Sequence, residues 1–140
     1  MLKNLSPLLN GSLLQILADM GHGDLLAVVD ANFPTVSCAK RLVRLEGASA
    51  TEALEAILTL FPIDDFIPNP VGVMGPSSRE PAPMLGSFDG VVTAGEGRHI
   101  DIETIERFAF YEKAKAAYAI VATSERRPYG CIVLAKGVVR

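Results

Sequence analysis

Short apolar runs that alternate with helical segments place the strongest constraint on the fold of this chain. The runs Leu25–Val29, Tyr118–Thr123 and Cys131–Leu134 are four to six residues long, a length typical of buried strands. Helical patterns lie between them, which favours an α/β fold with helices covering a mostly parallel or mixed sheet. With 140 residues and no internal repeat or linker, the sequence predicts a single domain over residues 1–140.

Periodicity and capping signals locate the individual elements. The first helix is expected to begin with Ser12 as its N-cap and to stop at Gly21, and Ser49 and Glu52 fit a capping box. The segment Gly75–Gly97 is rich in Gly and Pro and is predicted to be mostly loop. The predicted helices are Ser12–Met20, Ala50–Leu60 and Arg107–Ala117, and the predicted strands are Leu25–Asp30, Lys40–Leu45, Val71–Met74, His99–Ile105, Tyr118–Thr123 and Cys131–Leu134.

Composition points to an apolar surface that other subunits bury. Hydrophobic residues make up 49% of the chain and charged residues 21%, with a mean hydropathy of +0.30. We interpret the excess as a sign of homo-oligomerisation, the alternative being a very apolar core. The net charge of -3 without a Lys/Arg cluster argues against nucleic-acid binding. Apolar runs are far shorter than the ~20 residues of a membrane span, and a signal-peptide pattern is lacking at Met1, so no membrane association and a cytoplasmic location are expected.

Cysteine and histidine positions indicate neither a disulfide nor a metal site. Cys38 and Cys131 are far apart without CxxC spacing, so both are expected to be free thiols. The two histidines, His22 and His99, belong to no recognisable ligand pattern.

His22 is the first candidate for chemistry. It lies between two glycines, Gly21 and Gly23, at a turn that leads from a helix into a strand. An imidazole titrates near neutral pH and can give or take a proton under cellular conditions. A histidine that caps the end of the preceding helix is the alternative, and spacing alone does not decide between the two.

Three further side chains stand where ligands are often bound. Asp30 ends a buried strand, where α/β sheets bind ligands, although it can also cap the following turn or orient His22. Arg107 opens a helix, where a cation gains nothing from the helix dipole, so it either serves a ligand or interface or is simply solvated. Tyr129 precedes a strand and can present its hydroxyl to a ligand or serve a structural role.

These candidates lie in blocks that resemble the D-ribose pyranase and L-fucose mutarotase family (RbsD/FucU), and the fucose mutarotase branch in particular. The similarity spans nearly the whole chain, and several long matches occur in the same order. The matching blocks are Met1–Asn4, Ser6–Leu8, Leu17–Asp24, Asp30–Pro34, Arg107–Ala114, Ala119–Thr123 and Tyr129–Val138.

The resemblance implies an isomerase that interconverts the α and β anomers of a reducing sugar such as L-fucose without a cofactor. It assigns His22 as the proton donor and Asp30, Arg107 and Tyr129 as substrate-binding residues. Family members are similar in forming ring-like oligomers, commonly decamers, with sites near subunit contacts. Oligomers of this kind would account for the apolar excess.

Cys131 departs from the family pattern, which has asparagine there. The position counts among the substrate-binding ones, but a thiol is a weaker hydrogen-bond partner than an amide. Gly75–Gly97 also matches poorly, so the sugar itself stays open. The alternative function is a non-catalytic monosaccharide-binding protein for uptake or regulation, and a purely structural subunit is a third possibility.

Overall fold

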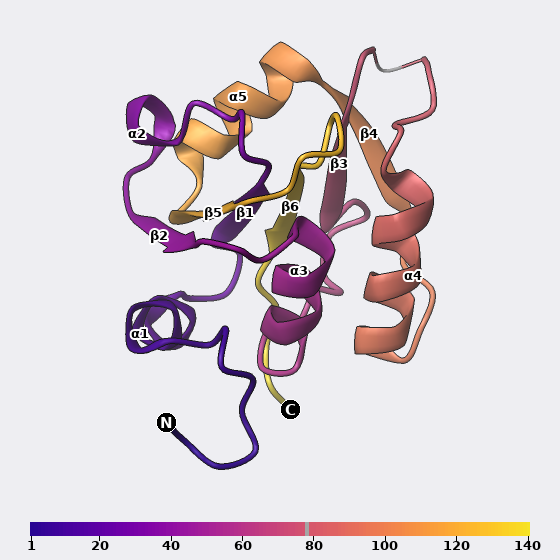
Figure 1. The fold of residues 1–140 in the computed structure, drawn as a ribbon. Helices are drawn as coiled ribbons and strands as arrows, with labels where there is room; N and C mark the ends of the chain where they lie inside the picture. The colour runs from indigo at the N-terminus through magenta and orange to yellow at the C-terminus, as the bar shows by residue number, and fades with distance from the viewer. Residues whose placement is uncertain (78) are drawn as a thin grey trace.

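Six strands form one mixed sheet with helices on both faces (Figure 1), which confirms the predicted α/β class. The computed structural model describes residues 1–77 and 79–140. The elements are α1 (Gly11–Asp19), β1 (Leu25–Val29), α2 (Thr35–Cys38), β2 (Leu42–Leu45), α3 (Ala50–Leu58), β3 (Val71–Gly75), α4 (Leu85–Glu96), β4 (Ile102–Glu106), α5 (Arg107–Ala116), β5 (Ala119–Thr123) and β6 (Ile132–Ala135).

The strand order β2-β5-β1-β6-β3-β4 brings several strand ends to one edge of the sheet. β1 and β5 are parallel, as are β2 and β5 and β3 and β4, whereas β6 runs antiparallel to both of its neighbours, β1 and β3. The carboxyl ends of β1, β3 and β4 therefore meet the beginning of β6. Ligands of α/β sheets are usually bound at such an edge.

The side chains of the central strands alternate between two faces and pack into two separate cores. Leu26 and Val28 of β1 point to the face covered by α1, α3 and α4, while Ala27 and Val29 point to the face covered by α2 and α5. This two-residue alternation is the geometric property of a strand that lets an unbroken apolar run serve both faces. All four side chains are 0% exposed, as expected for a strand covered on both sides.

The first helix begins and ends differently from the prediction. Asn10, not Ser12, is its N-cap, with Oδ1 accepting a hydrogen bond from the backbone N–H of Leu13. The helix ends at Met20 in an extended conformation, so Gly21 does not serve as a left-handed stop. The positive φ of 87° falls instead on Gly23, the second glycine beside His22.

Residues Gly75–Gly97 contain the twelve-residue helix α4, so the prediction of mostly loop there is wrong. Its three interior glycines weaken helix propensity by about 1 kcal/mol each, but Phe88 and Val92 are buried at helical spacing. Gly95 allows α4 to approach α3, because a Cβ there would lie 2.9 Å from Cβ of Leu58. Tertiary packing thus overrides local preference.

The remaining predicted elements are present with shifted ends, and α2 is an addition. The capping box of α3 is confirmed, with both the Ser49 and the Glu52 hydrogen bonds formed. Helix α3 stops at Leu58, before Pro62, and strands β2 and β4 begin two and three residues later than expected, at Leu42 and Ile102. Within the described residues, no helix is both long and apolar enough to cross a membrane.

Candidate functional site

A pocket at the shared edge of the sheet contains all four predicted substrate-binding residues: Asp30, Arg107, Tyr129 and Cys131. They come from the end of β1, the start of α5 and the segment that leads into β6. The pocket has a volume of about 180 Å³, and its other lining residues are Asn32, Phe33, Met74, Tyr111 and Pro128. A larger groove of about 460 Å³ lies between α3 and α4, and among the described residues that line it Glu55 is the only acidic one and none is a histidine.

Asp30 is held by backbone N–H groups on both sides. Its Oδ1 accepts from Asn32 at 3.1 Å, and its Oδ2 accepts from Gly130 at 3.2 Å. The carboxylate therefore caps the turn after β1, as one of the two sequence-based interpretations proposed, and it lines the pocket as well. Its contact with Gly130 also ties the end of β1 to the segment that carries Tyr129.

Tyr129 has an unusual backbone conformation. Its φ is 58°, in the left-handed region, which costs a residue with a Cβ about 1–2 kcal/mol. A Cβ on the adjacent Gly130 would lie 2.7 Å from Cγ of Glu125, so this position requires glycine. The segment therefore reaches the pocket through a strained turn that its surroundings hold in place.

Arg107 stands at the first position of α5, beside an acidic N-cap. The Glu106 carboxylate accepts from the backbone N–H groups of Phe108 and Ala109, both at 3.0 Å, and these bonds lower the pKa of Glu106. The guanidinium lies over the ring of Phe108 at 4.5 Å and is 5.8 Å from the ring centroid of Tyr111. These aromatic rings position the cation at the pocket while leaving it exposed.

Cys131 forms part of the pocket wall but is almost completely buried. It is 1% exposed, and its Sγ accepts a weak hydrogen bond from the backbone N–H of Asp30 at 3.5 Å. Burial, followed by the negative charge of Asp30, raises the pKa of the thiol well above its ordinary value. Both Cys131 and Cys38 are free thiols, as predicted.

His22 lies at the opposite end of β1 from this pocket. The five residues of β1 span about 13 Å at ~3.3 Å per residue. The imidazole does not contact Asp30, so the expectation that Asp30 could orient it within one copy is wrong. In the described residues the His22 ring bonds to Asp64 and not to the end of α1, where Nζ of Lys136 donates to the carbonyls of Leu17 and Met20 at 2.7 and 2.6 Å.

Asp64 is the partner of His22, and the sequence-based reasoning missed it. Its Oδ1 lies 3.0 Å from Nε2 of the imidazole and also accepts from the backbone N–H of Phe66 at 3.1 Å. The Asp64 side chain is 2% exposed and that of His22 is 40% exposed, and the ring of Phe66 packs edge-on against the imidazole at 4.7 Å between centroids. Two adjacent acidic residues, Asp64 and Asp65, inside the otherwise apolar stretch Leu60–Ile67 were the available signal.

Comparisons with known proteins identify the family. The model of the RbsD / FucU transport protein family matches residues 3–139, and the chain belongs to this family. An L-fucose mutarotase of Actinobacillus pleuropneumoniae serotype 5b is 37% identical over 140 residues, which cover 99% of this chain and 97% of the relative.

Two solved structures are similar to this chain over nearly its full length. The fucose mutarotase of Streptococcus pneumoniae in complex with L-fucose has a TM-score of 0.89 and 37% identity, and the match covers 99% of this chain and 100% of that one. FucU from Bifidobacterium longum has a TM-score of 0.89 and 38% identity with the same coverage.

Proposed function

We propose that this protein is a mutarotase that interconverts the anomers of L-fucose or a related monosaccharide. The observation that carries the proposal is the arrangement of a carboxylate, a guanidinium and a tyrosine around one pocket, with a separate histidine–carboxylate pair at the other end of β1. Full-length similarity to a fucose mutarotase that binds L-fucose supports the choice of sugar.

The reaction needs two proton transfers and no redox step. Ring opening gives a proton to the ring oxygen and removes one from the anomeric hydroxyl, and reclosure after rotation of the aldehyde reverses both transfers. In this proposal His22 protonates the ring oxygen, with Asp64 holding the imidazole. Asp30 and Arg107 bind sugar hydroxyls, and Tyr129 orients the sugar or takes part in the second transfer. Positioned acid/base groups of this kind contribute about 10²–10⁴-fold.

A second copy of the chain supplies the histidine to the pocket in this proposal. One sugar ring cannot contact both ends of β1 in the same copy, because the strand between them spans about 13 Å. The pocket of about 180 Å³ is also smaller than the ~300–1,000 Å³ of most ligand pockets, as expected for a half-site. Apolar side chains lie exposed beside each half: Phe66 is 64% exposed near His22, and Phe108 is 60% exposed near Arg107.

Contacts between unlike faces generate rings when the rotation closes, so a ring-shaped homo-oligomer, in the family's manner a decamer, is the proposed assembly. The proposed location is the cytoplasm, where reducing conditions suit two free thiols.

Saturation-transfer NMR on fucose, ribose and galactose tests the activity. We expect the protein to accelerate anomer exchange of at least one of these sugars and His22→Ala to abolish the acceleration while leaving the fold intact. Binding without acceleration by the unaltered protein would instead identify a monosaccharide-binding protein. Unchanged exchange in His22→Ala would reject His22 as the proton donor.

Mixed oligomers test the shared site. His22→Ala and Asp30→Asn chains, each expected to be inactive alone, are unfolded together and reassembled in equal amounts. Random assembly then gives about a quarter of the sites an intact histidine and an intact pocket, so we expect about a quarter of the unaltered activity. Activity that stays at the level of the separate variants would exclude a site built from two copies.

A further inference from the structure

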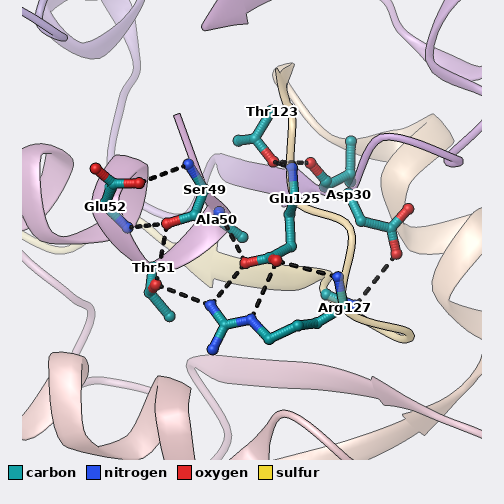
Figure 2. Close-up of polar contacts among 10 residues, drawn as sticks. Asp30, Ser49, Ala50, Thr51, Glu52, Thr123, Glu125 and Arg127 are labelled. Carbon is teal, nitrogen blue, oxygen red and sulfur yellow. Dashed lines mark hydrogen bonds and ion pairs between the residues drawn. The ribbon is translucent and has the colours of Figure 1, made fainter. Parts of the chain in front are cut away.

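Glu125 is a buried carboxylate beside the pocket, although the sequence predicts a polar turn over Glu125–Pro128. The residue is 5% exposed and lies between the start of α3 and the segment that leads to Tyr129 (Figure 2). Its Oε1 accepts from the backbone N–H of Ala50 at 3.2 Å and from Nη2 of Arg127 at 2.7 Å. Its Oε2 accepts from both Nε and the backbone N–H of Arg127, each at 3.1 Å.

Arg127 therefore holds the carboxylate at two points with its side chain and at a third with its backbone. Its Nη2 also donates to Oγ1 of Thr51 at 3.1 Å, which fastens the pair to the first turn of α3 (Figure 2). These bonds, chiefly those from the Arg127 side chain, lower the pKa of Glu125 from 4.5 to about 2. The ion pair is thus formed throughout the neutral range.

Glu125 is also hydrogen-bonded, directly or through Thr123, to the backbone on both sides of Asp30. Its carbonyl accepts from the N–H of Ala31 at 2.9 Å. Its N–H donates to Oγ1 of Thr123 at 3.2 Å, and that hydroxyl donates to the carbonyl of Val29 at 2.7 Å. The position of Glu125 therefore fixes the end of β1, where Asp30 enters the pocket.

Glu125 also supports the turn that carries Tyr129. Its side chain packs so closely against Gly130 that a Cβ there would lie 2.7 Å from Cγ of Glu125. The N–H of Gly130 donates to Asp30, and Tyr129 is held at a φ of 58° between Gly130 and the anchored Arg127 segment. Neither Glu125 nor Arg127 belongs to the residues that line the described pocket.

We propose that Glu125 and Arg127 are positioning residues that act through Tyr129 and Asp30, setting where these two side chains stand in the pocket. The proposal rests on the mutarotase function. Arg127 keeps the segment before Tyr129 folded against α3, and Glu125 links that segment to the end of β1. They do more than stabilise the fold, because they fix two pocket residues from different parts of the chain relative to each other.

Arg127→Lys tests the proposal because it keeps the positive charge and loses the pair of guanidinium hydrogen bonds to the Glu125 carboxylate. We expect kcat/KM for anomer exchange to fall about tenfold or more, since displacements of about 1 Å cost up to 10²-fold. Thr51→Val, which removes the bond from Arg127 and the one between Thr51 Oγ1 and Ser49 Oγ, is expected to give a smaller loss in the same direction. Arg126→Lys is the matched control: it is exposed, and within the described part of the chain its side chain makes no hydrogen bond or ion pair.

A double-mutant cycle with Tyr129→Phe separates positioning from a merely structural role. If Arg127 acts through Tyr129, Arg127→Lys should cost less than about twofold in the Tyr129→Phe background, because coupled residues do not contribute additively. The same factor in both backgrounds, with thermal melts unchanged, would overturn the proposal that Arg127 acts through Tyr129. No loss in Arg127→Lys itself would overturn it as well. Thr51→Val provides the same cycle if Arg127→Lys does not fold.

Measurements on the unaltered protein distinguish the mutarotase function from the positioning role. A lack of accelerated exchange with every sugar tested contradicts the mutarotase function and not the positioning role. In that case the same cycle is measured by titration calorimetry with L-fucose. A loss of affinity in Arg127→Lys that disappears in the Tyr129→Phe background supports positioning, and an equal loss in both backgrounds rejects it.

Discussion

The Nε2 atom of His22 lies 3.0 Å from Oδ1 of Asp64, so a half-exposed imidazole is held by an almost fully buried carboxylate. A second histidine–carboxylate pair, His99 and Asp101 at 2.9 Å, is exposed on both sides. The two pairs have similar geometry but differ in burial. Because a buried carboxylate interacts more strongly with an imidazolium than an exposed one does, only the first pair is suited to support proton transfer.

Asp64→Asn is expected to slow anomer exchange at least about tenfold, because the variant loses the charge that stabilises the imidazolium and orients the ring. The amide is similar in size and can still accept from Phe66. Exchange rates from saturation-transfer NMR measure the effect. Asp101→Asn is the matched control and should leave the rate unchanged. Equal rates for Asp64→Asn and the unaltered protein would contradict the role of Asp64.

Cys131→Ala should change KM for the sugar less than about threefold, since the thiol is 1% exposed and directed at the backbone N–H of Asp30. A cost in stability of about 1 kcal/mol is expected from the lost buried contacts. Progress curves at varied sugar concentration give KM, and urea titrations give the free energy of unfolding. A rise in KM above about tenfold would show direct sugar contact by the thiol.

Gly130→Ala is expected to lower the free energy of unfolding by about 1–3 kcal/mol. The new methyl group would meet Cγ of Glu125 at 2.7 Å, the carbonyl of Arg127 at 3.1 Å and Cβ of Asp30 at 3.3 Å. Gly86→Ala in α4 is the contrasting variant, since no described atom outside its chain neighbours and its own helix backbone lies within 4 Å of the new Cβ, and it should stabilise by about 0.4–1 kcal/mol. Similar effects of both variants in urea titrations would contradict this account.

Glu125→Gln should destabilise the protein more at pH 7 than at pH 3. The folded pKa of about 2 lies below the ordinary 4.5, so the stabilisation is complete above pH 4.5 and is lost as the pH falls towards 2. The Arg127 side chain is 48% exposed, so solvent screening weakens the ion pair. Its contribution to the free energy of unfolding at pH 7 is therefore about 1–3 kcal/mol. Urea titrations at both pH values and one protein concentration measure the difference. An equal difference at the two pH values would contradict the ion pair as its cause.

The sequence predicted the elements whose signals are local and missed the contacts that depend on distant partners. Ser49 and Glu52 indicate the start of α3, because both partners of the capping box lie within four consecutive residues. Helix α4 was missed because its glycines are compensated only by packing against α3 and the sheet.

The candidate site was predictable in part for the same reason. Asp30, Arg107, Tyr129 and Cys131 follow or precede strands or open a helix, and they do meet in one pocket. The pairing of His22 with Asp64, 42 positions away, has no local signature. The separation of His22 from Asp30, by contrast, already follows from the strand predicted between them, because the two residues flank its opposite ends.

β6 connects the pocket with the turn that carries His22. The residues before it, Tyr129 and Cys131, belong to the pocket, and the residue after it, Lys136, holds the end of α1 next to the His22 turn through two carbonyls. The four residues of β6 thus set the distance between the His22 turn and the pocket within one subunit. Since a one-residue slip turns every side chain of a strand to the other face, an insertion here would, in the proposed ring of subunits, displace the His22 turn from the pocket in every copy at once.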